Sequence, residues 1–484
     1  MATRPDASDR TADRIADVTA RSASLRRELG LATLVLTQVM YIVGSGWVGT
    51  AAKLGPSHVV FWCLAIALFY LPQAAVVIYL NRLMPLEGGL YQWATVGLGD
   101  FAGFLTAWNL WAYSIFVMGV FGVMIATNLA YLITPIGATF TTSWWYTLIV
   151  SSASVIALTV VSLFGMRVGK WLQNIGGASQ LLMFAALIAV PFIAAGRGTP
   201  TYHQAAVALP ALSLLSLNIF GKMALGALSG FEYVAILAGE CRDPGKNIGR
   251  SVMLAAPAVG LMFIFGTSSV LTLVPQDRID LVSPIPQTLQ AGFAGLGVAR
   301  FIVPALILLL LARQLGNVTL IFAGNTRLPM VAGWDRLAPA WFTRLHPRFH
   351  TPYHSILFVG GLTLALTVAS QIGVGLQEAF QLIENAAGIL YAFTYIALFA
   401  IPLVGSARLG VRPPIWLRLA SASGLAVSLL YSVLSVFPII DVASWQTFAA
   451  KIITMLVAVN LVGGGLYVMG RYDSRRIESG RTRP

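Results

Sequence analysis

The chain has 484 residues, of which 57% are hydrophobic and 10% charged, and its net charge is +13. A soluble protein carries about a quarter charged residues, so this composition indicates an all-α integral membrane protein with many spans. The Lys and Arg residues lie in short segments between apolar stretches, without the basic, aromatic-interleaved helix of a nucleic-acid-binding surface.

Twelve stretches are long and apolar enough to be membrane-spanning helices, each of which needs about 20 residues. They are Leu31–Ala51, Val59–Asn81, Phe101–Ile133, Trp144–Phe164, Trp171–Ala195, Pro210–Gly239, Ser251–Val274, Ala299–Pro329, Tyr353–Gln371, Glu378–Leu403, Pro414–Phe437 and Thr447–Met469. The segment Ile279–Gly297 contains Pro284 and Pro286 and is too short for a span. We expect it to be an external loop with a short helix.

The distribution of Lys and Arg predicts the orientation of these spans. If the N-terminus is inside, 24 of the 31 basic residues fall in inner segments and four in outer ones. We therefore expect both tails, residues 1–30 and 471–484, to be cytoplasmic. The charged first 30 residues lack the short apolar region and cleavage site of a signal peptide, so the first span is expected to be an uncleaved anchor.

Two of the spans are interrupted by small residues at their centres. The first contains Gly44, Ser45 and Gly46, and the sixth contains Gly226 and Ser229–Gly230. Glycines in spans often serve only close helix packing. Matched interruptions five spans apart instead predict an inverted-repeat transporter with its site at the breaks.

Five short motifs occur in order at matching spans, and together they resemble the amino acid–polyamine–organocation (APC) superfamily over about Leu29–Leu403. They are Gly44-Ser45-Gly46, the P-x-x-G-G-x-Y loop in Met84–Trp93, Gly230-Phe231-Glu232, the E-x-x-x-P-x-[KR]-N-[IL] loop in Glu240–Ile248, and the run from Asn325 through Leu337-Ala338-Pro339 to Thr351-Pro352. The resemblance implies a LeuT-type fold with a 5+5 inverted repeat. The transport core would be residues 31–403, followed by two additional helices in 404–470.

The resemblance also implies a substrate site. The substrate carboxylate would meet backbone amides at Ser45, Gly46 and Trp47, and its amine would meet carbonyls near Val43 and around Leu228. Side chains of the third span, near Trp111 and Ser114, would form a wall. The full set of substrate-binding residues implied is Val43, Gly44, Ser45, Gly46, Trp47, Trp111, Ser114, Gly226, Leu228, Ser229, Gly230 and Phe231.

The sequence departs from its relatives at two places. Many relatives carry an aromatic lid three or four residues before the glycine of the sixth-span break, where this chain has Leu225–Leu228. We expect a roomier pocket at Gly226 or a lid from elsewhere, with Trp47 a candidate. Some relatives carry a Lys in the fifth span, and alignment puts Gln180 at that position. A neutral amide cannot replace a fixed cation, so the coupling implied by that Lys does not transfer.

Three charged residues within spans are candidates for proton coupling or for structural roles. Glu232 abuts the sixth-span break and Glu384 lies early in the tenth span. Ionisable residues at such depth mark functional sites by default, but for Glu232 we favour a structural role, in which the carboxyl group satisfies freed backbone groups or a neighbouring span. Arg313 lies near the centre of the eighth span, too deep to reach the interface, so we expect Glu232 or Glu384 as its partner. Lys222 is either a buried partner or reaches the interface.

These features predict a secondary active transporter that moves an amino acid or related amine across the cytoplasmic membrane by alternating access. Proton symport and exchange stay open, as do a polyamine substrate and a non-transporting amino acid receptor. No phosphate-binding loop is present, which excludes ATP-driven transport by this chain alone, and no nucleophile–base or metal set is present, so we do not expect an enzyme. We also expect no cofactor, no metal, no nucleic acid and no obligate protein partner. Two cysteines, Cys63 and Cys241, exclude a disulfide framework.

Overall fold

The structure is a computed structural model that is helical throughout nearly all of its described part. The ranges described are 29–84, 89–133, 140, 143–164, 166–198, 202–203, 207–236, 241–331, 341–342, 344–347, 349, 351–372 and 375–478, without the side chains of 166–174, 236, 323, 327, 330–331, 406–407 and 471–478. Most of the N-terminal tail, the end of the C-terminal tail, and the motif residues Pro85–Gly88, Glu240 and Leu337–Pro339 lie outside these ranges.

Eleven helices in the described part are long and apolar enough to cross a membrane, or twelve if one bent pair counts as a single span. The bent pair is α2 (Leu31–Ile42) and α3 (Ser45–Ala52). The unbroken long helices are α7 (Asp100–Ala130), α9 (Trp144–Leu163), α10 (Met166–Gly196), α13 (Pro244–Leu273), α15 (Ala299–Val331), α16 (Tyr353–Ser370), α17 (Leu376–Val404), α19 (Ile415–Leu434) and α20 (Trp445–Glu478). Every predicted span coincides with one of these helices or with a composite described next.

Two further spans contain π-helical turns. The second span consists of α4 (His58–Ala65), a π-helical turn (Ile66–Tyr70) and α5 (Leu71–Leu83). The sixth consists of α11 (Leu214–Gly221), a π-helical turn (Lys222–Ala227) and α12 (Phe231–Ile236). Such turns are uncommon and recur at functional sites, because the extra residue distorts the helix locally.

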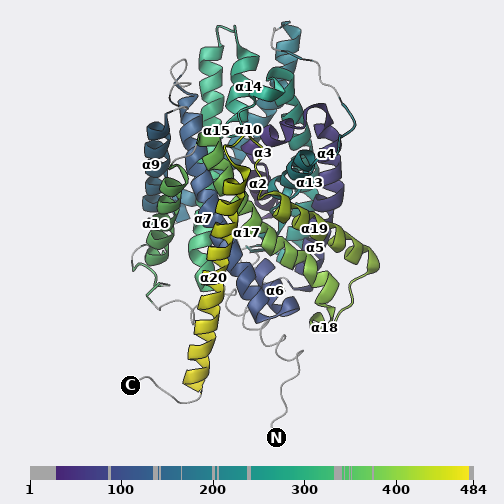
Figure 1. The fold of residues 1–484 in the computed structure, drawn as a ribbon, viewed down its shortest axis with the longest axis vertical. Coiled ribbons are helices and arrows are strands. Elements are labelled where there is room, and N and C mark those ends of the chain that lie inside the picture. The colour runs from purple at the N-terminus through teal and green to yellow at the C-terminus, as the bar shows by residue number, and fades with distance from the viewer. Residues whose placement is uncertain are drawn as a thin grey trace.

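Short helices lie at both ends of the bundle. The helices α6 (Leu90–Leu98) and α18 (Ser406–Leu409) are at one end and α14 (Pro284–Phe293) is at the other (Figure 1). The short helix expected in the segment Ile279–Gly297 is therefore confirmed. The loop expected after the second span is partly wrong, because Leu90–Leu98 forms a helix whose buried face includes Leu90, Trp93 and Ala94.

The outer helices expose large apolar side chains, as a bilayer requires. Leu419 on α19 is 67% exposed, Leu461 on α20 is 70% exposed and Ile149 on α9 is 62% exposed. In contrast, α7 lies inside the bundle and is buried along most of its length. Among the candidate spans, α7 has the most buried apolar window and is therefore placed to form the wall of an internal site.

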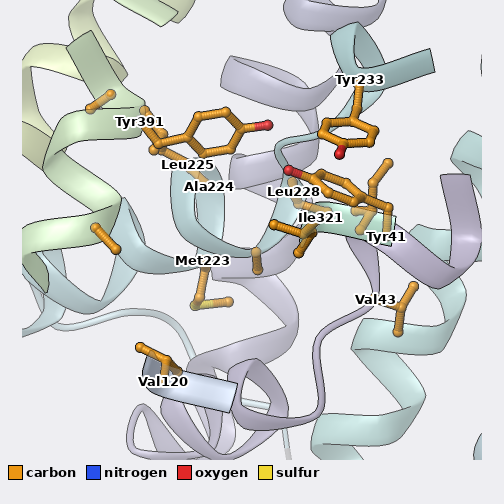
Figure 2. Packing of buried hydrophobic residues seen from close by; sticks show 14 of the residues in the cluster. Tyr41, Val43, Val120, Met223, Ala224, Leu225, Leu228, Tyr233, Ile321 and Tyr391 are labelled. Carbon is orange, nitrogen blue, oxygen red and sulfur yellow. The ribbon is translucent and has the colours of Figure 1, made fainter. Parts of the chain in front are cut away.

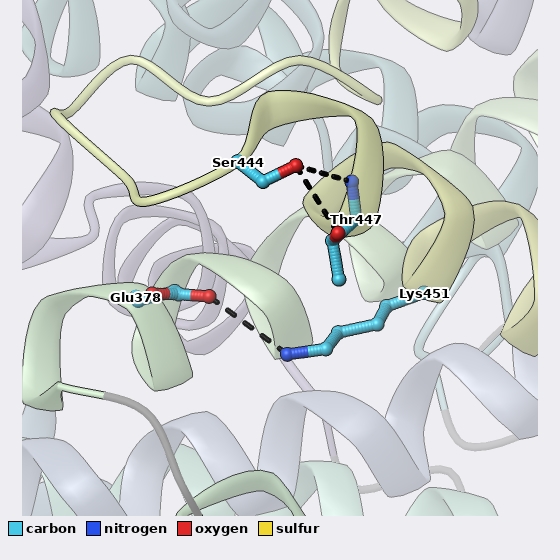
Figure 3. A network of polar contacts seen from close by, with 4 residues as sticks. All are labelled: Glu378, Ser444, Thr447 and Lys451. Carbon is cyan, nitrogen blue, oxygen red and sulfur yellow. Dashed lines mark hydrogen bonds and ion pairs between the residues drawn. The ribbon is translucent and has the colours of Figure 1, made fainter.

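A polar contact at the surface joins α17 to α20. The Nζ atom of Lys451 lies 3.9 Å from Oε1 of Glu378, and Ser444 caps the start of α20 by accepting a hydrogen bond from the Thr447 amide at 3.2 Å (Figure 3). Exposed ion pairs of this kind contribute about 0–1 kcal/mol. This ion pair therefore contributes little to the packing of α20 against the bundle.

Candidate functional site

The first helix break separates α2 from α3, which meet at an angle of 46°. Val43 (φ −77°, ψ 86°) and Gly44 (φ −81°, ψ 136°) leave the helical conformation, so the break comes one residue before the predicted Gly44–Gly46. Ser45 and Gly46 form the first turn of α3. The break leaves carbonyls free at the end of α2 and amides free at the start of α3.

The second break lies at Ser229–Gly230, between the π-helical turn and α12. Gly230 has φ +134°, a conformation that residues with a side chain rarely adopt. A Cβ atom there would lie 2.6 Å from Cδ1 of Tyr41 and 2.9 Å from Cγ1 of Ile42. Glycine at 230 is thus required both by the backbone and by close packing of the second break on the end of α2.

A cavity of about 90 Å³ lies between the two breaks. Its wall combines backbone at the breaks with side chains of α7, α15 and α17. The lining residues are Tyr41, Ile42, Gly44, Ser45, Gly46, Trp47, Tyr113, Val117, Val120, Phe121, Met124, Leu225, Gly226, Ser229, Arg313, Asn317, Ile321, Glu384, Ala387, Gly388 and Tyr391. A mostly apolar cavity with few convergent polar groups is typical of a small-molecule site.

The structure brings together part of the predicted residue set. Gly44, Ser45, Gly46, Trp47, Gly226 and Ser229 line the cavity, as do the charged residues Arg313 and Glu384. Val43, Leu228, Gly230 and Phe231 are not among the lining residues and are buried beside it.

Trp111 and Ser114 are on α7 but not on the cavity wall. Trp111 stacks on Phe358 of α16, and the hydroxyl of Ser114 donates to the carbonyl of Leu110 at 2.7 Å. Consecutive residues in an α-helix are about 100° apart, so the neighbouring Tyr113 can face the cavity where Ser114 does not.

The face of α7 that does line the cavity has a helical spacing. It consists of Tyr113, Val117, Val120, Phe121 and Met124. This apolar stripe was present in the sequence, but α7 is apolar on all sides, so periodicity could not distinguish it from the other faces.

Comparison with known proteins identifies the family. The model of the amino acid permease family matches residues 29–459, most of the chain. The chain belongs to the amino acid permease family. This confirms the resemblance found in the motifs.

The relatives of this permease are distant in sequence. An uncharacterized transporter of Legionella pneumophila is 24% identical over 387 residues, covering 78% of this chain and 80% of that protein. The branched-chain amino acid permease BcaP of Bacillus subtilis is 24% identical over 415 residues, with 77% and 82% covered. A probable agmatine/putrescine antiporter of Lactococcus lactis is 20% identical over 375 residues, with 77% and 78% covered.

A solved structure shares the fold. The transporter MhsT in complex with L-phenylalanine superposes with a TM-score of 0.57 and 13% identity, covering 84% of this chain and 98% of that one. The permease therefore has the LeuT-type fold.

Glu232 of the permease lies in a buried hydrogen-bond cluster. Its carboxyl oxygens accept from the hydroxyls of Tyr391 and Tyr395, and from Nε2 of Gln73 at 3.2 Å. Figure 2 shows Tyr391 on one side and the rings of Tyr41 and Tyr233, which stack with centroids 4.2 Å apart, on the other. These contacts tie α12 to α5 and α17, in keeping with a structural role for Glu232.

Arg313 is bound to backbone rather than to a carboxylate. Its Nη2 donates to the carbonyl of Val43 at 2.8 Å and approaches that of Met40 at 3.4 Å. The expectation of Glu232 or Glu384 as its partner is wrong, because within the described residues Arg313 forms no ion pair. Its cation instead meets the C-terminal carbonyls of α2, where the helix dipole is negative.

Gln180 reaches the same carbonyl, with Nε2 donating to Val43 at 3.0 Å. At this carbonyl α10 supplies a neutral amide and α15 a fixed cation. No local sequence pattern signals that these two side chains meet at one carbonyl.

Lys222 and Glu384 form a second buried polar group. The ammonium of Lys222 donates to Oδ1 of Asn385 and interacts electrostatically with Glu384, which is on the cavity wall. Lys222 is 1% exposed, so it is a buried partner and does not reach an interface.

The segment before α14 covers α3. The carbonyl of Leu281 lies 3.5 Å from where a Cβ of Gly46 would be, and the hydroxyl of Tyr131, just after α7, donates to Oδ2 of Asp280 at 3.0 Å. Burial and the adjacent Asp280 carboxylate raise the pKa of Tyr131 above its usual value. Tyr131 therefore remains a hydrogen-bond donor at neutral pH and holds this segment to the end of α7.

Proposed function

We propose that this permease is a secondary active transporter that moves an amino acid or related amine across the cytoplasmic membrane by alternating access. The observation that carries the proposal is the opening of two helix breaks onto one internal cavity. Broken helices present amides and carbonyls at membrane depth without charged side chains, and rocking of the helices around such a site exposes it to each side in turn.

The start of α3 suits a carboxylate. The amides of Ser45, Gly46 and Trp47 are in the first turn of an eight-residue helix, where free N–H groups and the helix dipole favour an anion. The hydroxyl of Ser45 and the Nε and Nη1 atoms of Arg313 are buried and lack hydrogen-bond partners in the described part of the chain. Unsatisfied buried donors are costly, so a carboxylate that reaches them is strongly favoured.

Other groups of the site suit an ammonium group. Glu384 supplies a carboxylate on the cavity wall, and the second break supplies the carbonyl of Ser229 there and that of Leu228 beside it. The Val43 carbonyl is a weaker partner than the sequence suggested, because Gln180 and Arg313 already use both of its acceptor positions. The ammonium would therefore meet Glu384 and the second break.

A zwitterion fits this arrangement better than a polyamine. A diamine has no carboxylate, so the amides of α3 and the free N–H groups of Arg313 would stay unsatisfied. The relatives include both a branched-chain amino acid permease and a probable agmatine/putrescine antiporter, so a polyamine is retained as the second candidate. A receptor that binds without transport is the third. Both tails would be cytoplasmic, residues 31–403 would form the 5+5 repeat core, and proton symport and exchange are both compatible with the site.

Counterflow in proteoliposomes tests the proposal. The purified protein is reconstituted with one unlabelled compound inside, and uptake of the same labelled compound is followed for each amino acid, agmatine and putrescine. We expect saturable uptake that is accelerated by internal substrate for at least one amino acid. Uptake of polyamines alone would favour the second candidate, and binding without counterflow would favour the receptor.

Two variants separate site effects from general damage. Glu384→Gln removes the charge on the cavity wall and should reduce counterflow by at least about tenfold, the effect of losing a charged hydrogen bond of about 1.5 kcal/mol or more. Glu378→Gln alters only the partly exposed carboxylate that pairs with Lys451 and should leave counterflow unchanged. Equal activity of both variants would contradict the placement of the ammonium.

A further inference from the structure

The indole ring of Trp47 lies between two glycines, one from each helix break. A Cβ built on Gly44 would lie 2.5 Å from Cδ1 and 2.9 Å from Nε1 of the ring. A Cβ built on Gly226 would lie 2.6 Å from Cη2 and 2.8 Å from Cζ3. The pyrrole edge of the indole thus rests on the first break and its benzene edge on the sixth span.

The backbone does not explain why these two positions are glycine. Gly44 has φ −81°, and Gly226 is not among the residues with positive φ. Any residue can adopt such conformations, in contrast to Gly230 at φ +134°. The indole is therefore what excludes a side chain at both positions, since distances below 3.0 Å to a rigid ring cannot be relieved without moving the ring.

Trp47 also faces the cavity. It is partly exposed there, and Gly44, Gly226 and Leu225 line the same wall. The ring fills space that two missing side chains leave open, and it limits the cavity on the side where the two breaks meet. Its removal would enlarge the cavity, while a side chain on Gly226 would compete with the ring for the same space.

We propose that Trp47 determines the largest substrate side chain that the site accepts. This inference rests on the proposed transport of an amino acid through this cavity. The limit is steric: the indole is held by the rigid breaks, so it cannot yield to a bulky substrate without separating them.

The test is a set of transport measurements on Trp47→Ala, Gly226→Ala and the double variant. Counterflow is measured for a series of increasing size from alanine through leucine to phenylalanine and tryptophan. In Trp47→Ala, kcat/KM for the largest transported compounds should rise relative to alanine by about tenfold or more, the usual range when a pocket loses such a contact. Gly226→Ala should lose counterflow by at least about tenfold, because its methyl group displaces the ring.

The double variant is the decisive member of the set. The three atoms nearest to a Cβ on Gly226, at 2.6, 2.8 and 3.1 Å, all belong to the Trp47 ring. Removing the ring therefore removes the clash, so Trp47→Ala should restore the counterflow that Gly226→Ala removes. Gly177→Ala is the matched control, since its Cβ would lie 3.9 Å from Leu36 and should be tolerated. Failure of the double variant to recover, or an unchanged size series in Trp47→Ala, would overturn the inference.

Thermal unfolding keeps this inference distinguishable from the proposed function. Gly226→Ala should lower the unfolding midpoint when Trp47 is present and change it little in the Trp47→Ala background, whether or not the protein transports anything. The shift of the midpoint by added amino acids reports binding separately, because a ligand that binds only the native state stabilises it. If the wild-type protein binds amino acids but shows no counterflow, the proposal of transport is wrong, and the size limit can still be measured from binding. If the wild-type protein transports amino acids and the variants accept the same range of substrate sizes, only the proposed role of Trp47 is wrong.

Discussion

Tyr395→Phe should weaken the fold by about 2.5 kcal/mol or more, because the Tyr395 hydroxyl joins three elements at the second break. It donates to Glu232, accepts from Nε2 of Gln73 at 2.5 Å and accepts from the amide of Gly230 at 2.9 Å. The substitution leaves the Gly230 amide buried without a partner, which costs about 1–3 kcal/mol, and removes a hydrogen bond to a carboxyl group worth about 1.5–3 kcal/mol if it is charged. The quoted loss is the sum of the lower bounds.

Tyr70→Phe is the matched control. Tyr70 is 1% exposed and stacks on Phe231 next to the same break, yet its hydroxyl has no hydrogen-bond partner in the described part of the chain. Removing this hydroxyl should leave the free energy of unfolding unchanged or raise it slightly, because no bond is lost. Both variants keep the aromatic ring, so they differ only in the polar contacts.

The free energy of unfolding can be measured by titrating the purified protein with a denaturing detergent in mixed micelles. The free energies of unfolding of Tyr395→Phe and Tyr70→Phe are compared with each other. Each variant lacks one tyrosine hydroxyl, so their difference reports the hydrogen bonds of Tyr395 alone. Equal free energies for Tyr395→Phe and Tyr70→Phe would refute the view that the cluster around Glu232 holds the second break in place.

Two further predictions concern the polar contacts of Arg313 near the first break and those of the covering segment, the residues around Asp280 and Leu281 that lie over α3. Arg313→Leu removes the cation from the Val43 carbonyl and should reduce counterflow by at least about tenfold. Adding Gln180→Lys to this variant supplies a cation from α10 and should restore part of the counterflow. No recovery would show that the guanidinium itself is needed. Tyr131→Phe removes the hydrogen bond to Asp280 and should increase proteolysis of the covering segment. Because the folded-state pKa of Tyr131 is raised, its contribution to stability is present below pH of about 10 and is lost as pH rises further, so the variant should show a smaller alkaline decrease in unfolding midpoint than wild type.

The sequence by itself determined the spans, both breaks and the family. Hydropathy is a property of consecutive residues, and so is the disruption caused by Gly44 or Gly230, so each could be found without knowing what lies nearby. For Glu232 the sequence favoured a structural role, because a carboxyl group beside a break has freed backbone and neighbouring spans to satisfy, and its hydrogen bonds to Gln73, Tyr391 and Tyr395 are in keeping with that prediction.

Only the tertiary structure decided which groups meet at the breaks. Trp47 and Gly226 are far apart in sequence, as are Val43 and Arg313, and no periodicity links the members of either pair. The residues predicted for the α7 wall, Trp111 and Ser114, do not line the cavity, whose wall begins at Tyr113, because a helix that is apolar on every side does not reveal its inner face. These contacts depend on how the helices pack, and packing is set by the whole bundle rather than by any segment.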